Sequence, residues 1–174
     1  MPAWRWKKRS LAKTPSGVRM IEHGALLDDE GLEQIERHGG YLVATPARFF
    51  HPEGVEKSAS KSPAILERLM RARAMQDAVM PKAIRAGVNI ALGSDNMHGM
   101  LHYDIGCLVR WGATPLDGLR AATAKAAEAA QLADRGMLAP GLRADLVVVR
   151  GDASRDAGAI ADVLRVMKEG QWLA

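Results

Sequence analysis

The chain has 174 residues, of which 48% are apolar, so it can fill the core of one ordinary domain but is shorter than the roughly 200–250 residues of a complete eightfold β/α barrel. Its net charge of +4 comes from the N-terminus: six basic residues precede the first acidic residue, Glu22, and 18 basic against 20 acidic residues remain after them. We therefore expect no nucleic-acid partner.

Membrane insertion and secretion are not expected either. The sequence has no apolar run near the roughly 18 residues of a spanning helix, and no apolar segment with a cleavage site follows its basic N-terminus. The single cysteine, Cys107, cannot form an internal disulfide. A lone thiol is typical of a reducing compartment, which predicts a cytoplasmic protein.

The first half of the chain alternates short apolar runs with helical patterns. Residues 1–16 show no clear period and are predicted to be an irregular basic tail. A strand is predicted over 18–21, and a helix capped by Asp28 follows over 28–38 until two glycines stop it. A second strand is predicted over 41–44.

A long connection follows the second strand. Residues 46–62 are rich in Ser, Pro and charge and are predicted to be a loop, with a length typical of an active-site cover. A helix should start at Pro63, be broken or kinked by Pro81 and end at Gly87. A third strand is predicted over 88–92.

The next segment combines a glycine- and histidine-containing loop with two helices. The loop is predicted over 93–103. The second helix should begin with a capping pair, Thr114 and Asp117. An alanine-rich stretch over 121–130 favours close helix packing.

This order predicts a parallel sheet followed by a smaller β-rich part. Residues 17–134 contain three β-α units, which is typical of a parallel sheet covered by helices. Residues 135–174 contain two further predicted strands, over 146–149 and 163–167. We therefore expect an α/β domain and a separate β-rich subdomain.

Polar residues follow all three strands of the predicted parallel sheet. His23, Thr45 and Asp95 lie at the carboxyl ends, where side chains of parallel strands converge on one cavity. A neutral imidazole suits a divalent transition metal, and a carboxylate can bind the metal or accept a proton from its water. Such a metal lowers the pKa of bound water to about 7. The ends of the strands thus predict a hydrolytic metal site.

A structural interpretation of the same residues remains open. A histidine that follows a strand is often held by hydrogen bonds alone, and an aspartate after Gly-Ser commonly caps a helix or forms a turn. Taken singly, neither His23 nor Asp95 establishes a metal site.

Three motifs resemble the amidohydrolase superfamily, in its imidazolonepropionase-like and Xaa-Pro dipeptidase-like branch. They are Ile21-Glu22-His23-Gly24, Gly93-Ser94-Asp95 and the run from Asp134 to Val149 with its Pro-Gly turn. The resemblance covers about residues 17–173. It implies the C-terminal portion of a metal-dependent (β/α)8 TIM barrel, about three βα units, followed by strands of a small β-sandwich subdomain.

The resemblance also implies roles for individual residues. His23 would be a metal ligand, and Asp95 would both bind metal and carry a proton from the attacking water to the leaving amine. His102 would contact substrate, with His98 as a competing candidate, and Thr45 is a further candidate substrate contact. The implied cofactor is a divalent metal, expected to be zinc. The implied substrate is a small-molecule amide, cyclic amide or dipeptide, cleaved at a carbon–nitrogen bond.

Part of the family pattern is missing. The family's first ligand pair is His-x-His, and the sequence contains no such pair. We therefore expect the isolated chain to be an incomplete, inactive fragment, or a subunit completed by a second polypeptide that supplies the front half of the barrel; a homo-oligomer is also open. A second hypothesis is a binding module in which the Trp4-Arg5-Trp6-Lys7-Lys8-Arg9 tail contacts anionic surfaces.

Overall fold

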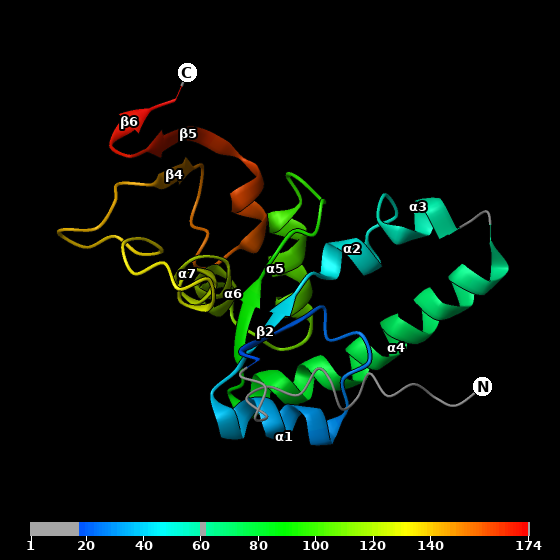
Figure 1. Ribbon diagram of the computed structural model, residues 1–174. Coiled ribbons are helices and arrows are strands. Elements are labelled where there is room, and N and C mark those ends of the chain that lie inside the picture. The colour runs from blue at the N-terminus through cyan, green and yellow to red at the C-terminus, as the bar shows by residue number, and fades with distance from the viewer. Residues whose placement is uncertain (1–17, 60–61, 174) are drawn as a thin grey trace.

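Two three-stranded sheets organise the fold, and they differ in strand direction (Figure 1). The computed structural model describes residues 18–59 and 62–173, so the predicted tail over 1–16 lies outside the described residues. The first sheet is parallel in the order β1-β2-β3, and the second is antiparallel in the order β4-β5-β6. The strands are β1 (Met20–Glu22), β2 (Tyr41–Ala44), β3 (Asn89–Leu92), β4 (Leu146–Val149), β5 (Val163–Lys168) and β6 (Gln171–Trp172).

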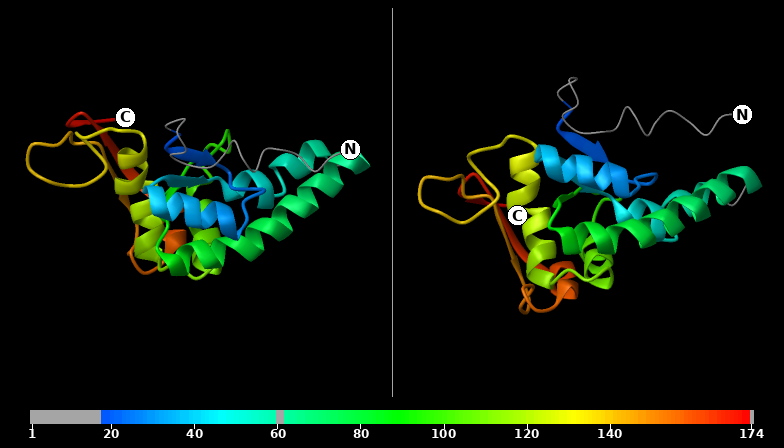
Figure 2. Two further views of the ribbon diagram at one scale, coloured as in Figure 1. Left: turned by 60° about the horizontal axis from the view of Figure 1, so that its bottom comes forward. Right: turned by 90° about the horizontal axis from the view of Figure 1, so that it is seen from below.

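Helices separate the parallel strands, as the alternating pattern predicts. Figures 1 and 2 show α1 and α4 side by side along the parallel sheet, and Figure 1 shows α7 on the side of that sheet where the antiparallel sheet lies. The helices are α1 (Asp29–His38), α2 (Pro46–Phe50), α3 (Val55–Ala59), α4 (Pro63–Ala86), α5 (Leu101–Arg110), α6 (Pro115–Ala122), α7 (Ala124–Ala129) and the 3₁₀ helix η2 (Ala157–Ala161).

The main core lies on one face of the parallel sheet. In register across the strands, Ile21 pairs with Leu42 and Leu42 with Ile90. Because side chains alternate along a strand, this row points to the helix-covered face, where Leu42 is fully buried beside Ile35 of α1 and Ile105 of α5. The opposite face holds a smaller cluster built around buried residues of β2, β3 and α7, namely Tyr41, Ala91 and Ala129.

The ends of α1 follow from local chemistry. The Asp28 side chain accepts a hydrogen bond from the N–H of Gly31 at 3.1 Å, which satisfies one of the free donors of the first turn. Gly39 ends the helix in the left-handed conformation, with φ of 59°. Both predicted signals of this helix are confirmed.

One sequence prediction is wrong in this region. The predicted loop over 46–62 contains the short helices α2 and α3. Pro81 was predicted to break or kink its helix. It does not break α4, because a buried row that includes Val79, Met80 and Ala83 packs the segment around the proline into the core, and the kink stays a prediction. Tertiary packing therefore outweighs the local cost of a proline inside a helix.

The start of α6 carries the predicted capping box. The Thr114 side chain accepts from the N–H of Asp117 at 3.1 Å, and the Asp117 carboxylate accepts from the N–H of Thr114. This arrangement also lowers the pKa of Asp117, chiefly through the hydrogen bond that the Thr114 hydroxyl donates.

We expect Thr114→Ala to lower the free energy of unfolding by about 1 kcal/mol, because the N–H of Asp117 loses its acceptor and the Asp117 carboxylate loses the hydroxyl that donates to it. Urea denaturation followed by circular dichroism measures this change. Ser62→Ala is the matched control, since Ser62 occupies the N-cap of α4 without a side-chain capping bond. Equal losses in the two variants would contradict the capping argument.

The antiparallel sheet is joined to the rest of the fold through η2, which packs against α5. Ion pairs link the segment after α7 to this sheet: Asp134 pairs with Arg143, and Arg143 with Glu169 of the β5–β6 turn. The predicted β-rich character of the C-terminal part is confirmed, whereas the exact boundary at 134/135 stays a prediction.

The parallel sheet ends at β1 on one side and at β3 on the other. Within residues 18–59 and 62–173, each of these strands pairs only with β2. Their outer edges therefore present backbone groups that an added strand can pair with. In the same part of the chain, no helix combines the length and apolarity needed to cross a membrane.

Candidate functional site

His23 is held in an unusual backbone conformation directly after β1. Its φ is 68°, in the left-handed region that non-glycine residues seldom adopt, and its N–H donates to the carbonyl oxygen of Val43 at 2.8 Å. Gly24 follows with φ of 62° and packs against Leu42. This tight turn changes the direction of the chain where β1 ends. A non-glycine residue with positive φ is strained, and such strain is often found at functional sites.

Asp95 has the same kind of conformation after β3. Its φ is 40°, and that of Asn96 is 68°. Three of the five non-glycine residues with positive φ in the described chain therefore lie at the carboxyl ends of β1 and β3. The Asp95 carboxylate lies 3.6 Å from the Nε atom of Arg48, a residue of α2.

The structure brings three predicted site residues together. His23 Nδ1 lies 2.8 Å from the Thr45 hydroxyl oxygen and 3.8 Å from Asp95 Oδ2. Thr45 is buried, while the side chains of His23 and Asp95 are each 39% exposed. The Phe49 ring packs edge-on against the His23 ring, with centroids 5.8 Å apart. A fixed imidazole and a carboxylate thus share one accessible edge of the sheet.

This arrangement leaves one ring nitrogen for further chemistry. His23 would hold a metal through a ring nitrogen, and the Thr45 hydroxyl would fix the orientation of the ring. The carboxylate of Asp95 offers a second oxygen ligand or a proton acceptor.

The donor set fits part of a metal site but not a whole one. A catalytic zinc site usually takes three protein ligands and a water. No group of three or more His, Cys, Asp and Glu side chains suited to a metal occurs in the described part of the chain.

His102 stays outside this contact network. It lies half-buried in the first turn of α5, and within the described segments no hydrogen bond, ion pair or ring contact joins it to His23, Thr45 or Asp95. His98 is exposed in the loop before α5. The predicted substrate contacts of these two histidines stay predictions.

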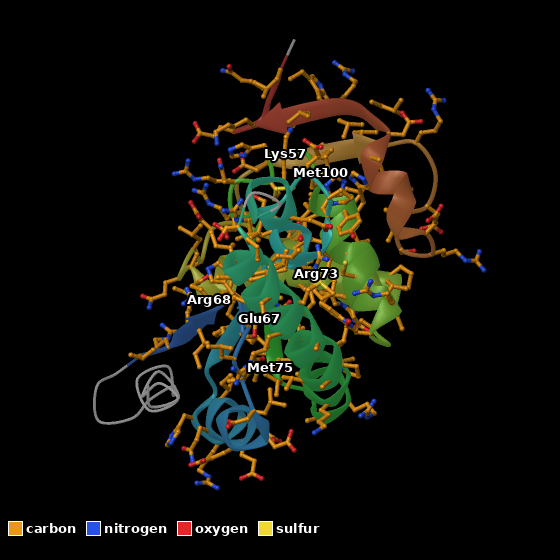
Figure 3. The ribbon with its side chains drawn as sticks, turned by 90° about the vertical axis from the view of Figure 1, so that its right-hand side faces the viewer. Lys57, Glu67, Arg68, Arg73, Met75 and Met100 are labelled. Carbon is orange, nitrogen blue, oxygen red and sulfur yellow. The ribbon has the colours of Figure 1, made fainter. Side chains whose placement is uncertain are left out.

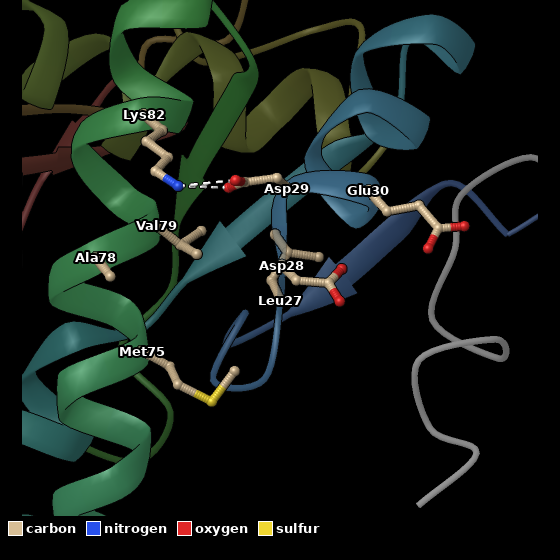
Figure 4. A pocket seen from close by; sticks show the side chains of 8 residues that line it. All are labelled: Leu27, Asp28, Asp29, Glu30, Met75, Ala78, Val79 and Lys82. Atoms are coloured by element: carbon tan, nitrogen blue, oxygen red, sulfur yellow. Dashed lines mark hydrogen bonds and ion pairs between the residues drawn. The ribbon is translucent and has the colours of Figure 1, made fainter.

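A groove of about 400 Å³ lies elsewhere, between α1 and α4 (Figure 4). Its walls include apolar Leu27 and Val79, and Lys82 crosses it to bind both oxygens of Asp29 at 2.7 and 2.9 Å. The groove contains none of the strand-end residues, so it is not the candidate catalytic cavity.

Comparison with known proteins decides the family. The model of the amidohydrolase family matches residues 11–173, which is nearly the whole chain. The chain belongs to the amidohydrolase family. This match confirms the resemblance deduced from the strand-end motifs and the Pro-Gly run.

Amidohydrolase relatives are recognisable at about one third identity. The chain is 33% identical over 158 residues to an adenine deaminase of Cereibacter sphaeroides, an alignment that covers 84% of the chain and 25% of the relative. It is 32% identical over 133 residues to an imidazolonepropionase of Ruegeria pomeroyi, covering 76% of the chain and 29% of the relative. The chain thus spans about a quarter of these relatives.

Solved amidohydrolase structures share the fold. A Xaa-Pro dipeptidase with methionine in its active site superposes with a TM-score of 0.81 at 27% identity, over 96% of this chain and 42% of that one. A prolidase complexed with N-methylphosphonate-L-proline gives 0.80 at 27% identity, over 91% and 41%. These matches confirm that the chain corresponds to part of an amidohydrolase TIM barrel.

Two residues at or near the candidate site were missed at the sequence level, Arg48 and Asp104. Asp104 lies in α5, is fully inaccessible to solvent and accepts a hydrogen bond from the N–H of Ala47 at 2.6 Å. A signal for Asp104 was present, since it falls within the apolar row of Leu101, Ile105 and Leu108. Arg48 had no comparable signal, because its segment was interpreted as a loop.

Residues 46–62, which were predicted to cover the active site, form hydrogen bonds with both α4 and α5. Arg73 of α4, labelled in Figure 3, donates from Nε to the carbonyl oxygen of Phe49 at 2.7 Å and from Nη2 to Glu56 of α3 at 2.6 Å. Asp104 holds the start of α2 from the α5 side. The segment that carries Thr45 and Arg48 to the site is therefore fixed to the helices behind it.

Burial raises the pKa of Asp104 to about 6, above its ordinary value of 3.8, although the Ala47 N–H acts in the opposite direction. Between pH 4 and 6 the folded protein therefore binds more protons at this group than the unfolded chain does. Stability should fall by about 3 kcal/mol as pH rises through this window and then level off.

An Asp104→Asn variant tests this pH dependence. Because asparagine is neutral at every pH, the variant should lack this fall, and its stability relative to the wild-type protein should be greater at pH 7 than at pH 4. Urea denaturation at several pH values measures the difference. Parallel stability curves for the two proteins would contradict the raised pKa.

Proposed function

We propose that this chain forms the C-terminal part of a hydrolase that acts on carbon–nitrogen bonds. The observation that carries the proposal is the convergence of His23 and Asp95, both in left-handed backbone, at the carboxyl ends of β1 and β3 in an amidohydrolase chain. Two parallel strands separated by β2 deliver an imidazole and a carboxylate to one place, which a purely structural role for either residue does not require.

In this proposal Asp95 carries the proton of the reaction. Its carboxylate accepts a proton from the attacking water and delivers it to the leaving nitrogen, which would otherwise depart as a poor leaving group. His23 is a metal ligand, and the metal, which we propose to be zinc, supplies water of lowered pKa when bound. Thr45 orients His23, and His102 is the further proposed substrate contact.

The proposed substrate is a small molecule with an amide, cyclic amide or dipeptide bond. The relatives named as adenine deaminase and Xaa-Pro dipeptidase support small nitrogen compounds as the class. Adenine is therefore included among the compounds to be assayed, beside a Xaa-Pro dipeptide and a cyclic amide.

We further propose that activity requires ligands from outside residues 18–173. Two protein ligands hold a metal weakly and without fixed geometry. The edges of β1 and β3, each paired only with β2 in the described chain, favour completion of the barrel by additional strands. A front-half polypeptide, meaning one that supplies the preceding strands and their ligands, is the proposed source. A subunit that is non-catalytic until completed in this way is the alternative function.

Zinc titration of the purified chain tests both parts of the proposal. We expect weak binding that is lost on gel filtration, together with no hydrolysis of the three compounds by the chain alone. His23→Asn and Asp95→Asn should each remove the weak binding, and asparagine tolerates the left-handed backbone at both positions. His38→Asn and Asp77→Asn, at sites distant from the strand ends in the sequence, are the controls.

The proposed roles of His23 and Asp95 and the proposed need for further ligands can be contradicted independently of each other. Equal zinc binding by the His23 and Asp95 variants and the controls would show that these residues are not the site. Tight stoichiometric zinc in the unaltered chain, with turnover, would show that the site is complete without further ligands.

A further inference from the structure

The start of α2 lacks the capping bond that its sequence offers. Thr45 occupies the N-cap position, but its side chain makes no capping hydrogen bond there. Pro46 at the first helical position has no N–H to donate. The first backbone donor that needs a partner is therefore the N–H of Ala47, which points into the protein interior, where Ala47 is fully buried.

Asp104 supplies that partner from a distant part of the chain. Its Oδ1 accepts the Ala47 N–H at 2.6 Å, although the two residues are 57 positions apart. Its other oxygen, Oδ2, is buried and has no hydrogen-bond partner among the residues that the structure describes. Keeping a buried carboxylate with one oxygen unsatisfied costs stability. An apolar side chain would avoid this cost but could not accept the Ala47 N–H.

The bond from Ala47 to Asp104 leaves the Thr45 hydroxyl available to His23. Thr45 Oγ1 lies 2.8 Å from His23 Nδ1, the contact that orients the imidazole. One residue after Ala47 on the same helix, Arg48 lies beside the Asp95 carboxylate at 3.6 Å. Residues at the start of α2 therefore contact both His23 and Asp95, and the bond from Ala47 to Asp104 attaches the start of this helix to α5.

We propose that Asp104 is a positioning residue for the strand-end site. By capping α2 in place of Thr45, it leaves the threonine hydroxyl to hold the His23 ring and keeps Arg48 next to Asp95. The functional meaning of this arrangement rests on the proposed function of His23 and Asp95, but the arrangement itself can be tested without metal or turnover.

Two nuclear magnetic resonance measurements on the full 174-residue chain report the Ala47–Asp104 bond and the Thr45–His23 contact. Hydrogen exchange of the Ala47 amide reports its bond to Asp104, and the ring ¹⁵N shifts of His23, assigned by loss of the signal in His23→Asn, report the Thr45 contact. Asp104→Ala should speed exchange of the Ala47 amide by about tenfold or more and move the His23 ring shifts. Asp104→Asn keeps an acceptor oxygen and should preserve both signals.

A third variant distinguishes the effect of the Thr45–His23 contact from a general loss of stability. Thr45→Val should move the His23 shifts as Asp104→Ala does, but it should leave the Ala47 amide protected, because that amide bonds to Asp104. Leu108→Ala, which removes a buried side chain from the same helix α5, is the control for lost stability and should leave the His23 shifts in place.

Three results would overturn the proposal: unchanged His23 shifts in folded Asp104→Ala, loss of both signals in Asp104→Asn, or unchanged His23 shifts in Thr45→Val. If Asp104→Ala does not fold, Asp104→Asn and Thr45→Val still decide the matter. Because none of these measurements involves zinc or substrate, failure of the proposed function would leave their outcome untouched.

Discussion

An Asp95→Asn variant is expected to lose roughly three orders of magnitude in the rate of carbon–nitrogen bond hydrolysis, which is the usual scale for removing a general acid–base group. The assay uses the chain together with the proposed front-half polypeptide. Asparagine keeps the size of the side chain and tolerates the φ of 40°, so the loss reflects the missing carboxylate rather than a changed backbone. The measurement is kcat for each of the three candidate substrates.

The fall should appear in kcat more than in KM, because the proton is transferred in the transition state and not on binding. Asp77→Asn is the matched control: Asp77 is also an exposed aspartate paired with an arginine, here Arg110 at 3.2 Å, and its replacement should leave kcat within a factor of about two. If Asp95→Asn retained a similar rate, Asp95 would be a structural residue of the turn and not the proton carrier.

Replacing Leu42 by Ala should lower the free energy of unfolding by about 4 kcal/mol, within the range seen for buried leucines. Leu42 is fully buried at the centre of β2, the middle strand of the parallel sheet. Its side chain also fills the space beneath the turn after His23, since a Cβ placed on Gly24 would lie only 2.8 Å from Leu42 Cδ1. The tight packing around Leu42 limits how far its neighbours can move into the cavity that the substitution leaves.

Urea denaturation measures this loss. Val147→Ala is the control, because Val147 is 55% exposed on β4 and its truncation should change stability by no more than about 0.5 kcal/mol. In Leu42→Ala the His23 ring should also become less ordered, since its supporting turn loses a neighbour. A loss below about 1 kcal/mol would show that the core relaxes into the space.

The parts of the fold that local chemistry determines could be predicted from the sequence. Asp28 and Gly39 bound α1, and Thr114 with Asp117 starts α6, because capping bonds join residues three or four positions apart. The three parallel strands follow from apolar runs between helical patterns. His23, Thr45 and Asp95 were expected to converge because they follow neighbouring strands, and their contacts confirm this convergence.

The remainder depends on contacts between distant residues. Helix α2 was interpreted as loop because its partners, Asp104 and the Trp111 ring that packs on Phe50, lie more than 50 residues away. The same reason hid Arg48, whose place beside Asp95 follows from that helix. A break at Pro81, one of the two predicted outcomes, does not occur, and a local rule carries no information about the buried row that holds α4 together.

The order β1-β2-β3 has a consequence for how the protein is made. In the described parallel sheet β2 pairs with β1 and β3 pairs with β2, so each of these two strands leaves the ribosome after the strand that it joins. Pairing can therefore proceed from the N-terminal to the C-terminal end, one helix-linked strand at a time, without waiting for a remote segment. The late link is the Ala47–Asp104 bond, so α2 should acquire its final position only after α5 has been translated.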